Sequence, residues 1–341
     1  MSASPTLRIM DAERPDGAWI KQASDEIFRH THTDGAVLLR GLTLRTSRDL
    51  AHIRDLLRIT RYCGAEEFLA RSYTTDMVTT PLPFPKTSQL CPFQEFSFSR
   101  QYPRYVLTAC IHASTPNDIS THQIVDTKRI IRNLPRALVA RLRSVGWRFD
   151  RNFHAGFGVS WIDAFNVTSD EALHEALGAL GIEYEWRTSE LLATTRRLPA
   201  MVTAPDTEEE CWFNDIAFFN IASVDRAQRT VLQHAFGSDV PATTYYGDGI
   251  APSVAELEAI RNSYDAATRR FSWRAGDLLI ADNLSCAQGR EATSADLALA
   301  VAFGGGRLSE VASRPRATHE RGFTASRDGR ASRDGDTPNV F

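Results

Sequence analysis

The stretch CPFQEFSF at residues 91–98 places a carboxylate, Glu95, between Phe93 and Phe96. Apolar and polar residues alternate here as they do in a half-buried strand. A carboxylate in such a place has three uses: it can hold a metal, it can transfer a proton, or it can face water. The residues around Glu95 indicate which of these uses applies.

Other residues that could do chemistry lack the context of a recognised site. His32-Thr33-Asp34 is the only His-x-Asp triplet in the chain, and we expect a solvated loop there, because a motif needs structural context. The five cysteines form no Cys-x-x-Cys pair, so neither a zinc knuckle nor a disulfide framework is expected. Cys286 would need a nearby base to act as a nucleophile, and we expect it to pack in the core.

Composition and charge bound the class of protein. The chain has 341 residues and a formal net charge of -3, which argues against a nucleic-acid partner because such partners usually require a Lys/Arg surplus. No apolar run approaches the roughly 18 residues of a membrane span. We therefore expect a cytoplasmic globular protein without a membrane partner.

The elements that must position these residues follow from hydrophobic periodicity and helix-capping residues. We predict helices at 17–29 and 46–62, at Thr127 to about Val145, after Ser169 through Ala179, and after Ser253. Strand-like runs occupy 35–42, 105–113, 147–154, 211–221, 242–247, 271–283 and 297–304. Strands scattered between helices predict an α+β fold, an antiparallel β core decorated by helices. The polar stretch 313–341 is expected to be a mobile tail after one domain at 1–312.

Five stretches in order resemble one known family: GAVLLRGL (35–42), FQEFSFSRQYPRYVL (93–107), CWFND (211–215), TTYYGDG (243–249) and AGDLLIADNLSCAQGRE (275–291). Together they resemble the TauD-like, clavaminate-synthase-like iron(II)/2-oxoglutarate dioxygenases, over residues 35–304. The resemblance is closest to the branch found in natural-product clusters. It implies a double-stranded β-helix, or jelly roll, with flanking helices and a lid-like insertion at about 155–210.

The functional positions of that family are altered in this chain. The family holds iron(II) with two imidazoles and one carboxylate, and the resemblance puts Phe93, Glu95 and Gln288 at those positions. A phenyl ring cannot ligate iron, and an amide is a poor ligand. The arginine that pairs with 2-oxoglutarate is also missing, because no Arg or Lys follows Arg290 before Arg307. The resemblance thus implies a vestigial triad, with no metal and no cofactor.

The resemblance also implies roles for the remaining residues. Glu95 would point into the barrel, where desolvation would raise its pKa and suit it to acid–base catalysis, with His122, at the position of a family threonine, as its proton partner. Alternatively, an internal arginine or a backbone amide holds Glu95 as a relic. Asp215 would face the active site or hydrogen-bond at a strand end. The remaining substrate-binding candidates are Phe93, Gln288, Arg290, Trp161 and Trp212.

These observations favour a metal-independent, dioxygenase-like protein of natural-product biosynthesis that binds a peptide or an amino-acid-derived intermediate. One hypothesis is an enzyme for a non-redox step, such as cyclisation or hydrolysis. The second is a binding or scaffold protein for the pathway product or a partner enzyme, and a third keeps a rearranged iron site. The chain also resembles the iron-less proteins of ribosomal peptide pathways such as that of crocagin. The sequence does not set the oligomeric state, so a homodimer or a pathway partner protein stays open.

Overall fold

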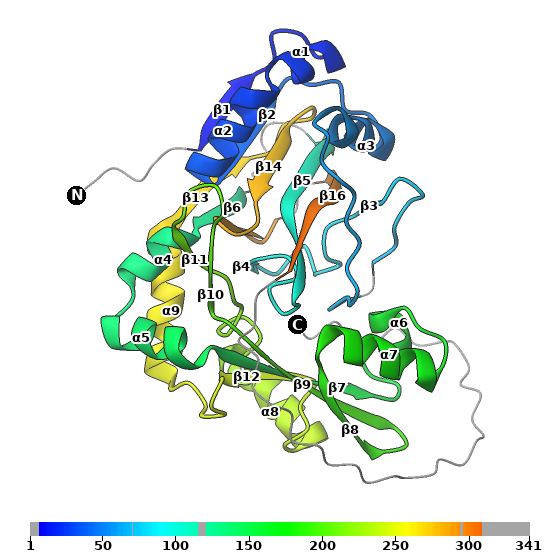
Figure 1. Ribbon diagram of the computed structural model, residues 1–341, viewed down its shortest axis with the longest axis vertical. Coiled ribbons are helices and arrows are strands. Elements are labelled where there is room, and N and C mark those ends of the chain that lie inside the picture. The colour runs from blue at the N-terminus through cyan, green and yellow to red at the C-terminus, as the bar shows by residue number, and fades with distance from the viewer. Residues whose placement is uncertain (1–6, 70, 115–120, 294–295, 309–341) are drawn as a thin grey trace.

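A computed structural model describes residues 7–69, 71–114, 121–293 and 296–308 (Figure 1). The predicted tail at 313–341 lies outside the described residues. Within them, no helix combines the length and the apolar character that a membrane crossing requires.

The larger sheet has six strands. Their order is β1 (Arg8–Asp11), β2 (Ala36–Arg40), β14 (Leu278–Asp282), β5 (Gln101–Ala113), β16 (Leu297–Leu308) and β3 (Val78–Thr79). Only β1 and β2 run parallel; the other neighbours in this sheet are antiparallel. The smaller sheet has the order β13 (Thr268–Ser272), β6 (Thr121–Asp126), β15 (Cys286–Arg290) and β4 (Leu90–Phe93), and all its neighbours are antiparallel.

Side-chain alternation on β2 and β14 shows how the layers stack. Val37 and Leu39 of β2 pack in one apolar cluster with residues of the helices that cover the outer face of the larger sheet. Leu38 packs instead with Ile124 of β6 and Cys286 of β15, from the smaller sheet. Successive side chains of a strand point to opposite faces, so β2 is buried on both sides. The predicted jelly-roll core with helical flanks is confirmed, and Cys286 packs inside it as expected.

A third sheet supports the lower part of the molecule in Figure 1. It has the order β12 (Ala242–Tyr246), β7 (Trp147–His154), β9 (Leu191–Leu198) and β8 (Glu183–Thr188). The short antiparallel pair β10 (Met201–Thr203) and β11 (Glu210–Trp212) follows β9 in the sequence. Residues 155–210, where an insertion is expected, form α6, α7, β8, β9 and β10.

The helices flank these sheets (Figure 1). They are α1 (Gly17–Gln22), α2 (Ser24–Asp34), α3 (Ser47–Leu56), α4 (Thr127–Asn133), α5 (Arg136–Val145), α6 (Trp161–Phe165), α7 (Asp170–Leu180), α8 (Arg226–Phe236), α9 (Val254–Ala267) and the 3-10 turn η1 (Ile221–Ser223). The capping predictions at Ser169 and Ser253 are confirmed, since both side chains accept hydrogen bonds from the first turns of α7 and α9.

Three predicted helices have the wrong extent. The helix expected from Thr127 to Val145 is two helices, because Pro135 has no N–H and keeps Leu134 extended. The helix expected at 17–29 is interrupted at Ala23. The helix expected at 46–62 ends at Leu56, and the chain then extends along β16, where Tyr62 N–H donates to the Phe303 carbonyl. His32, expected in a loop, lies in α2.

Two predicted strand runs are also wrong. The run 271–283 is two strands in different sheets, separated by a turn at Gly276, whose φ of 86° suits glycine. A Cβ at Gly276 would lie 2.4 Å from the Leu42 carbonyl oxygen. The run 211–221 ends as a strand at Trp212, because the Asn214 side chain accepts from the N–H of Ile216 and turns the chain.

Candidate functional site

Glu95 lies in a tight turn directly after β4, so the expectation that 91–98 is one strand is wrong. The turn is closed by Phe96, a non-glycine residue with a φ of 60°. Asn283 fixes the turn from the end of β14: its Oδ1 accepts from the Glu95 N–H at 2.9 Å, and its Nδ2 donates to the Glu95 carbonyl at 2.7 Å. The side chain of Glu95 is therefore aimed by a backbone that Asn283 holds in place.

Asp215 holds the same turn from another side. Its carboxylate accepts a hydrogen bond from the Ser97 hydroxyl and another from the Gln94 N–H at 3.4 Å. Only 2% of Asp215 is exposed, and burial raises its pKa to about 7. The contacts of Asp215 are those of a residue that hydrogen-bonds at the end of a strand, one of the two interpretations of its sequence position.

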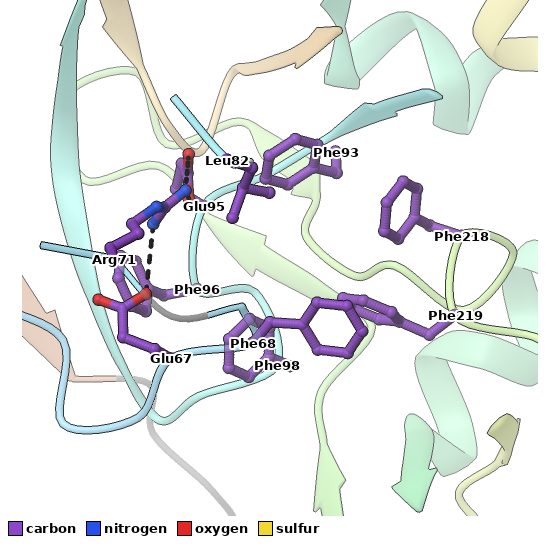
Figure 2. A pocket seen from close by; sticks show the side chains of 10 residues that line it. All are labelled: Glu67, Phe68, Arg71, Leu82, Phe93, Glu95, Phe96, Phe98, Phe218 and Phe219. Carbon is purple, nitrogen blue, oxygen red and sulfur yellow. Dashed lines mark hydrogen bonds and ion pairs between the residues drawn. The ribbon is translucent and has the colours of Figure 1, made fainter. Parts of the chain in front are cut away.

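The Glu95 carboxylate forms an ion pair with Arg71. Arg71 Nη2 lies 2.8 Å from Oε1 and 2.9 Å from Oε2 of Glu95 (Figure 2). The Arg71 side chain is 2% exposed, and its guanidinium carbon lies 5.8 and 5.2 Å from the ring centres of Phe96 and Phe303. The internal arginine that the sequence left open as a partner for Glu95 is thus Arg71.

A second carboxylate, Glu67, shares the same guanidinium. Arg71 Nη1 lies 3.5 Å from Glu67 Oε2, and the Tyr73 hydroxyl donates to Glu67 Oε1 at 2.6 Å. Burial raises the pKa of Glu67 to about 7, partly opposed by the Arg71 charge and the Tyr73 hydrogen bond. Sequence reasoning missed Glu67, because Glu66-Glu67 belongs to no motif; only its position between apolar residues in AEEF distinguishes it.

Phe93 and Gln288 lie side by side on adjacent strands of the smaller sheet. They are directly paired in the register of β4 and β15, so the two positions where the family resemblance expects imidazoles are neighbours. The Gln288 amide oxygen lies 3.3 Å from His122 Nε2 on β6, and His122 packs against the rings of Phe271 and Trp273. Burial lowers the pKa of His122 to about 4, so this imidazole is neutral at pH 7.

The two residues expected to exchange protons have different partners in the structure. Glu95 bonds to Arg71, whereas His122 bonds to Gln288. The carboxyl group with a pKa near neutrality on the wall of the adjacent pocket is Glu67.

That pocket, called the phenyl pocket below, is mostly apolar (Figure 2). One end is formed by Glu67, Arg71 and Glu95, and the rest by Leu82 and six phenyl rings, those of Phe68, Phe93, Phe96, Phe98, Phe218 and Phe219. The centre of a water-sized sphere can move through about 10 Å³ of this cavity, which is room for about one water molecule. A larger ligand must therefore displace part of the wall.

The remaining candidates occupy other places. Arg290 points to the segment before β4 and donates to the carbonyls of Phe84, Pro85, Lys86 and Ser88 at 2.7–3.2 Å. Trp212 is completely buried, and its indole N–H donates to the Asn214 carbonyl. Trp161 begins α6 and packs edge-on against Trp186. None of these three belongs to the described wall of the phenyl pocket.

The residues around Glu95 do not fit an iron(II) centre. In the family that the sequence resembles, iron(II) needs two nitrogen ligands beside the carboxylate, and the residues here are a phenyl ring and an amide that is hydrogen-bonded to His122. Both Glu95 oxygens already contact the Arg71 guanidinium. Across the described part of the chain, no three His, Cys, Asp or Glu side chains converge as a metal site would require.

Comparison with known proteins gives one family. The model of the taurine catabolism dioxygenase TauD, TfdA family matches residues 10–299. Dapdiamide synthesis protein DdaC of Enterobacter agglomerans is 27% identical over 316 residues, covering 89% of this chain and 92% of that protein.

Two solved structures are similar at lower identity. The PvcB protein of Pseudomonas aeruginosa is 14% identical with a TM-score of 0.47, and the match covers 88% of this chain and 86% of that one. Asparagine oxygenase, solved with Fe(II), 2S,3S-3-hydroxyasparagine and succinate, is 15% identical with a TM-score of 0.47, covering 86% of both chains. The family match at 10–299 contains every residue of the candidate site, from Glu67 to Gln288.

Proposed function

Because this chain belongs to the TauD/TfdA family of dioxygenases, we propose that it is a member that works without iron and 2-oxoglutarate. In this proposal the Arg71–Glu95 ion pair stands where the family places a metal–carboxylate bond. The chain acts on, or binds, a small amino-acid-derived or peptide intermediate in the biosynthesis of a natural product, through a non-redox step.

The observation that carries the proposal is the contact of Arg71 with both oxygens of Glu95. A guanidinium supplies the positive charge that a buried carboxylate requires. An iron(II) ion at Glu95 would have to displace Arg71 and would find no imidazole at position 93 or 288. The framework residues still stabilise the fold, because Arg104 of β5 forms an ion pair with Asp282 at 2.6 Å, both 0–1% exposed, and Asn283 holds the turn.

The biosynthetic setting is supported by the 27% identical relative, whose name assigns it to dapdiamide synthesis. The small-molecule ligand is supported by the pocket, which has an ionic end and an apolar body. Sites of this composition bury an apolar group and orient it by a few polar contacts. A step that moves protons rather than electrons suits a site that holds carboxyl groups but has no imidazole at positions 93 and 288.

A metal and cosubstrate titration tests the proposal. Protein reconstituted anaerobically with iron(II) is assayed for bound metal, for 2-oxoglutarate binding and for oxygen uptake. We expect far less than one iron per chain and no oxygen uptake that depends on 2-oxoglutarate. Stoichiometric iron together with oxygen uptake that depends on 2-oxoglutarate would overturn the proposal.

Incubation with candidate peptides and amino-acid derivatives then separates turnover from binding. We expect a product of unchanged oxidation state from the wild type and less product from Glu67→Gln, because Glu67 can exchange a proton near pH 7. Tight binding without conversion would contradict turnover and identify a binding protein of the pathway.

A further inference from the structure

We propose that the phenyl pocket binds a protonated amine attached to an aromatic or branched apolar group, with Glu67 as the carboxylate partner of the ammonium. This inference deepens the proposed function and rests on it, because an iron centre at Glu95 would remove Arg71 from its present place. It assigns a substrate class to the pocket and a binding role to Glu67.

Acidic side chains outnumber basic ones on the described wall of the pocket. Glu67 and Glu95 are both acidic, and Arg71 is the one basic residue among those that line the pocket in the described structure. The short contacts of Arg71 go to Glu95, at 2.8 and 2.9 Å, whereas its contact with Glu67 is 3.5 Å. Glu67 is therefore the carboxyl group that a further cation would complement.

The groups around Glu67 have opposing effects on its pKa. Arg71 and the Tyr73 hydroxyl stabilise the ionised form, while burial and the charges of Glu66 and Glu95 oppose it. The resulting pKa of Glu67 is about 7, so near pH 7 a proton on Glu67 partly neutralises the negative charge of the empty pocket. An ammonium group would take the place of that proton.

Two more guanidinium groups lie nearby but are otherwise engaged. Arg151 and Arg196 both pair with the fully buried Glu66, and they also donate to the carbonyls of Glu67, Phe68 and Phe98. Their guanidinium carbons lie 5.1 and 5.9 Å from the ring centres of Phe68 and Phe98, which themselves form the pocket wall. These cations thus contact the rings of the wall and do not line the cavity.

The six phenyl rings complete the complementarity. Ring faces attract cations, and rings together with Leu82 accept an apolar group. A ligand that carries an ammonium beside an aromatic or branched side chain meets both ends of the pocket. A carboxylate-bearing ligand would place a third negative charge beside Glu67 and Glu95.

Three probes with one ring and different charge test the inference: benzylamine, benzyl alcohol and phenylacetate. They are titrated calorimetrically into chelator-treated full-length wild type and into Leu82→Ala, which widens the cavity. We expect benzylamine to bind at least tenfold more tightly than the other two at pH 8, and we expect that preference to be lost in Glu67→Gln. Glu183→Gln, an exposed site on β8, is the matched control and should keep it.

Proton release gives a second readout that a merely structural role of Glu67 would not produce. Titrations in buffers of different ionisation enthalpy should show roughly 0.9 proton released per benzylamine at pH 6 and roughly 0.1 at pH 8, for a group that titrates near pH 7. Glu67→Gln should release none. Tyr73→Phe removes a hydrogen bond that favours the ionised form, so release should persist to higher pH.

Any one of three results would overturn the inference. Phenylacetate could bind more tightly than benzylamine, or wild type and Glu67→Gln could release equal numbers of protons. The third result is that neither wild type nor Leu82→Ala binds benzylamine. The two proposals fail separately, because the probes are titrated into metal-free protein. Stoichiometric iron with oxygen uptake would remove the proposed function while leaving the amine measurement interpretable.

Discussion

Arg71 contacts both oxygens of Glu95 through one nitrogen, Nη2, at 2.8 and 2.9 Å. The carboxylate that the sequence resemblance assigns to a metal-ligand position is thus engaged on both oxygens by a side chain of the same protein. Arg71 is 2% exposed, so water does not readily replace it. A metal site built at Glu95 would therefore require removal of this guanidinium as well as two added imidazoles.

Restoring both imidazoles should therefore not be enough. Phe93→His with Gln288→His supplies two nitrogen ligands opposite each other on β4 and β15. We expect weak iron(II) binding by this double variant, and at least tenfold tighter binding when Arg71→Leu is added, because Glu95 is then free to ligate. Anaerobic titration and the rise in melting temperature on adding iron(II) measure both.

The control is a quadruple variant, in which Glu95→Gln is added to the triple variant; it should not bind iron(II). Equal affinity of the double and triple variants would show that Arg71 does not compete with the metal. Absence of binding by both would contradict the assignment of positions 93 and 288 to the imidazoles.

The sequence predicted the fold well because its signals were local. Alternating apolar residues and capping serines gave β2, β5, β7, α7 and α9, and the motif resemblance gave the jelly roll. The errors lie where side chains or special backbone angles end an element. Asn214 ends β11 and Gly276 separates β13 from β14, and neither event changes the hydrophobic pattern that the prediction used.

The site was predicted only in part, for a similar reason. Phe93 and Gln288 are paired on neighbouring strands and Glu95 follows β4, but Arg71 and Glu67 come from a segment without a motif. The contacts of Arg71 with Glu95 and Glu67 join residues 24 and 4 positions apart along the chain. The aromatic side chains that form the pocket are phenylalanines, among them Phe218 and Phe219, rather than Trp161 and Trp212. Tertiary contacts of this kind leave no periodic signal in a sequence.

Removing the shared cation should destabilise the fold. Arg71→Met leaves Glu67 and Glu95 buried without their guanidinium, which typically costs about 3–5 kcal/mol. The loss should be smaller at pH 6 than at pH 8, because protonation of Glu67, whose pKa is about 7, relieves one of the two charges. Urea unfolding at both pH values measures it, with the exposed Arg61→Met as control. A loss equal to that of Arg61→Met would show that the pair is not stabilising.

The buried carboxyl of Asp215 should make the fold less stable as pH rises. Its pKa in the folded protein is about 7, above the ordinary value of 3.8, so the folded state binds the proton more tightly than the unfolded state. This contribution is fully present below pH 4 and is lost as pH rises through 7, by up to about 4 kcal/mol. Asp215→Asn should flatten the dependence of the unfolding free energy on pH between 4 and 8. The exposed Asp11→Asn serves as control, and an unchanged slope in Asp215→Asn would contradict the argument.

Arg290 should control how readily the pocket opens. Its guanidinium donates to four carbonyls in the segment 84–88, and Leu82, two residues before that segment, lines the pocket. Arg290→Ala removes all four bonds, so we expect amide hydrogen exchange at 80–90 to accelerate at least tenfold while the two sheets keep their protection. Arg290→Lys, with one point charge in place of a planar fork, should lie between the two. Arg270→Ala removes an arginine on β13 that pairs with the exposed Glu291 and should leave exchange at 80–90 unchanged. Equal exchange in the wild type and Arg290→Ala would mean that Leu82 is held by its packing against the phenyl rings instead.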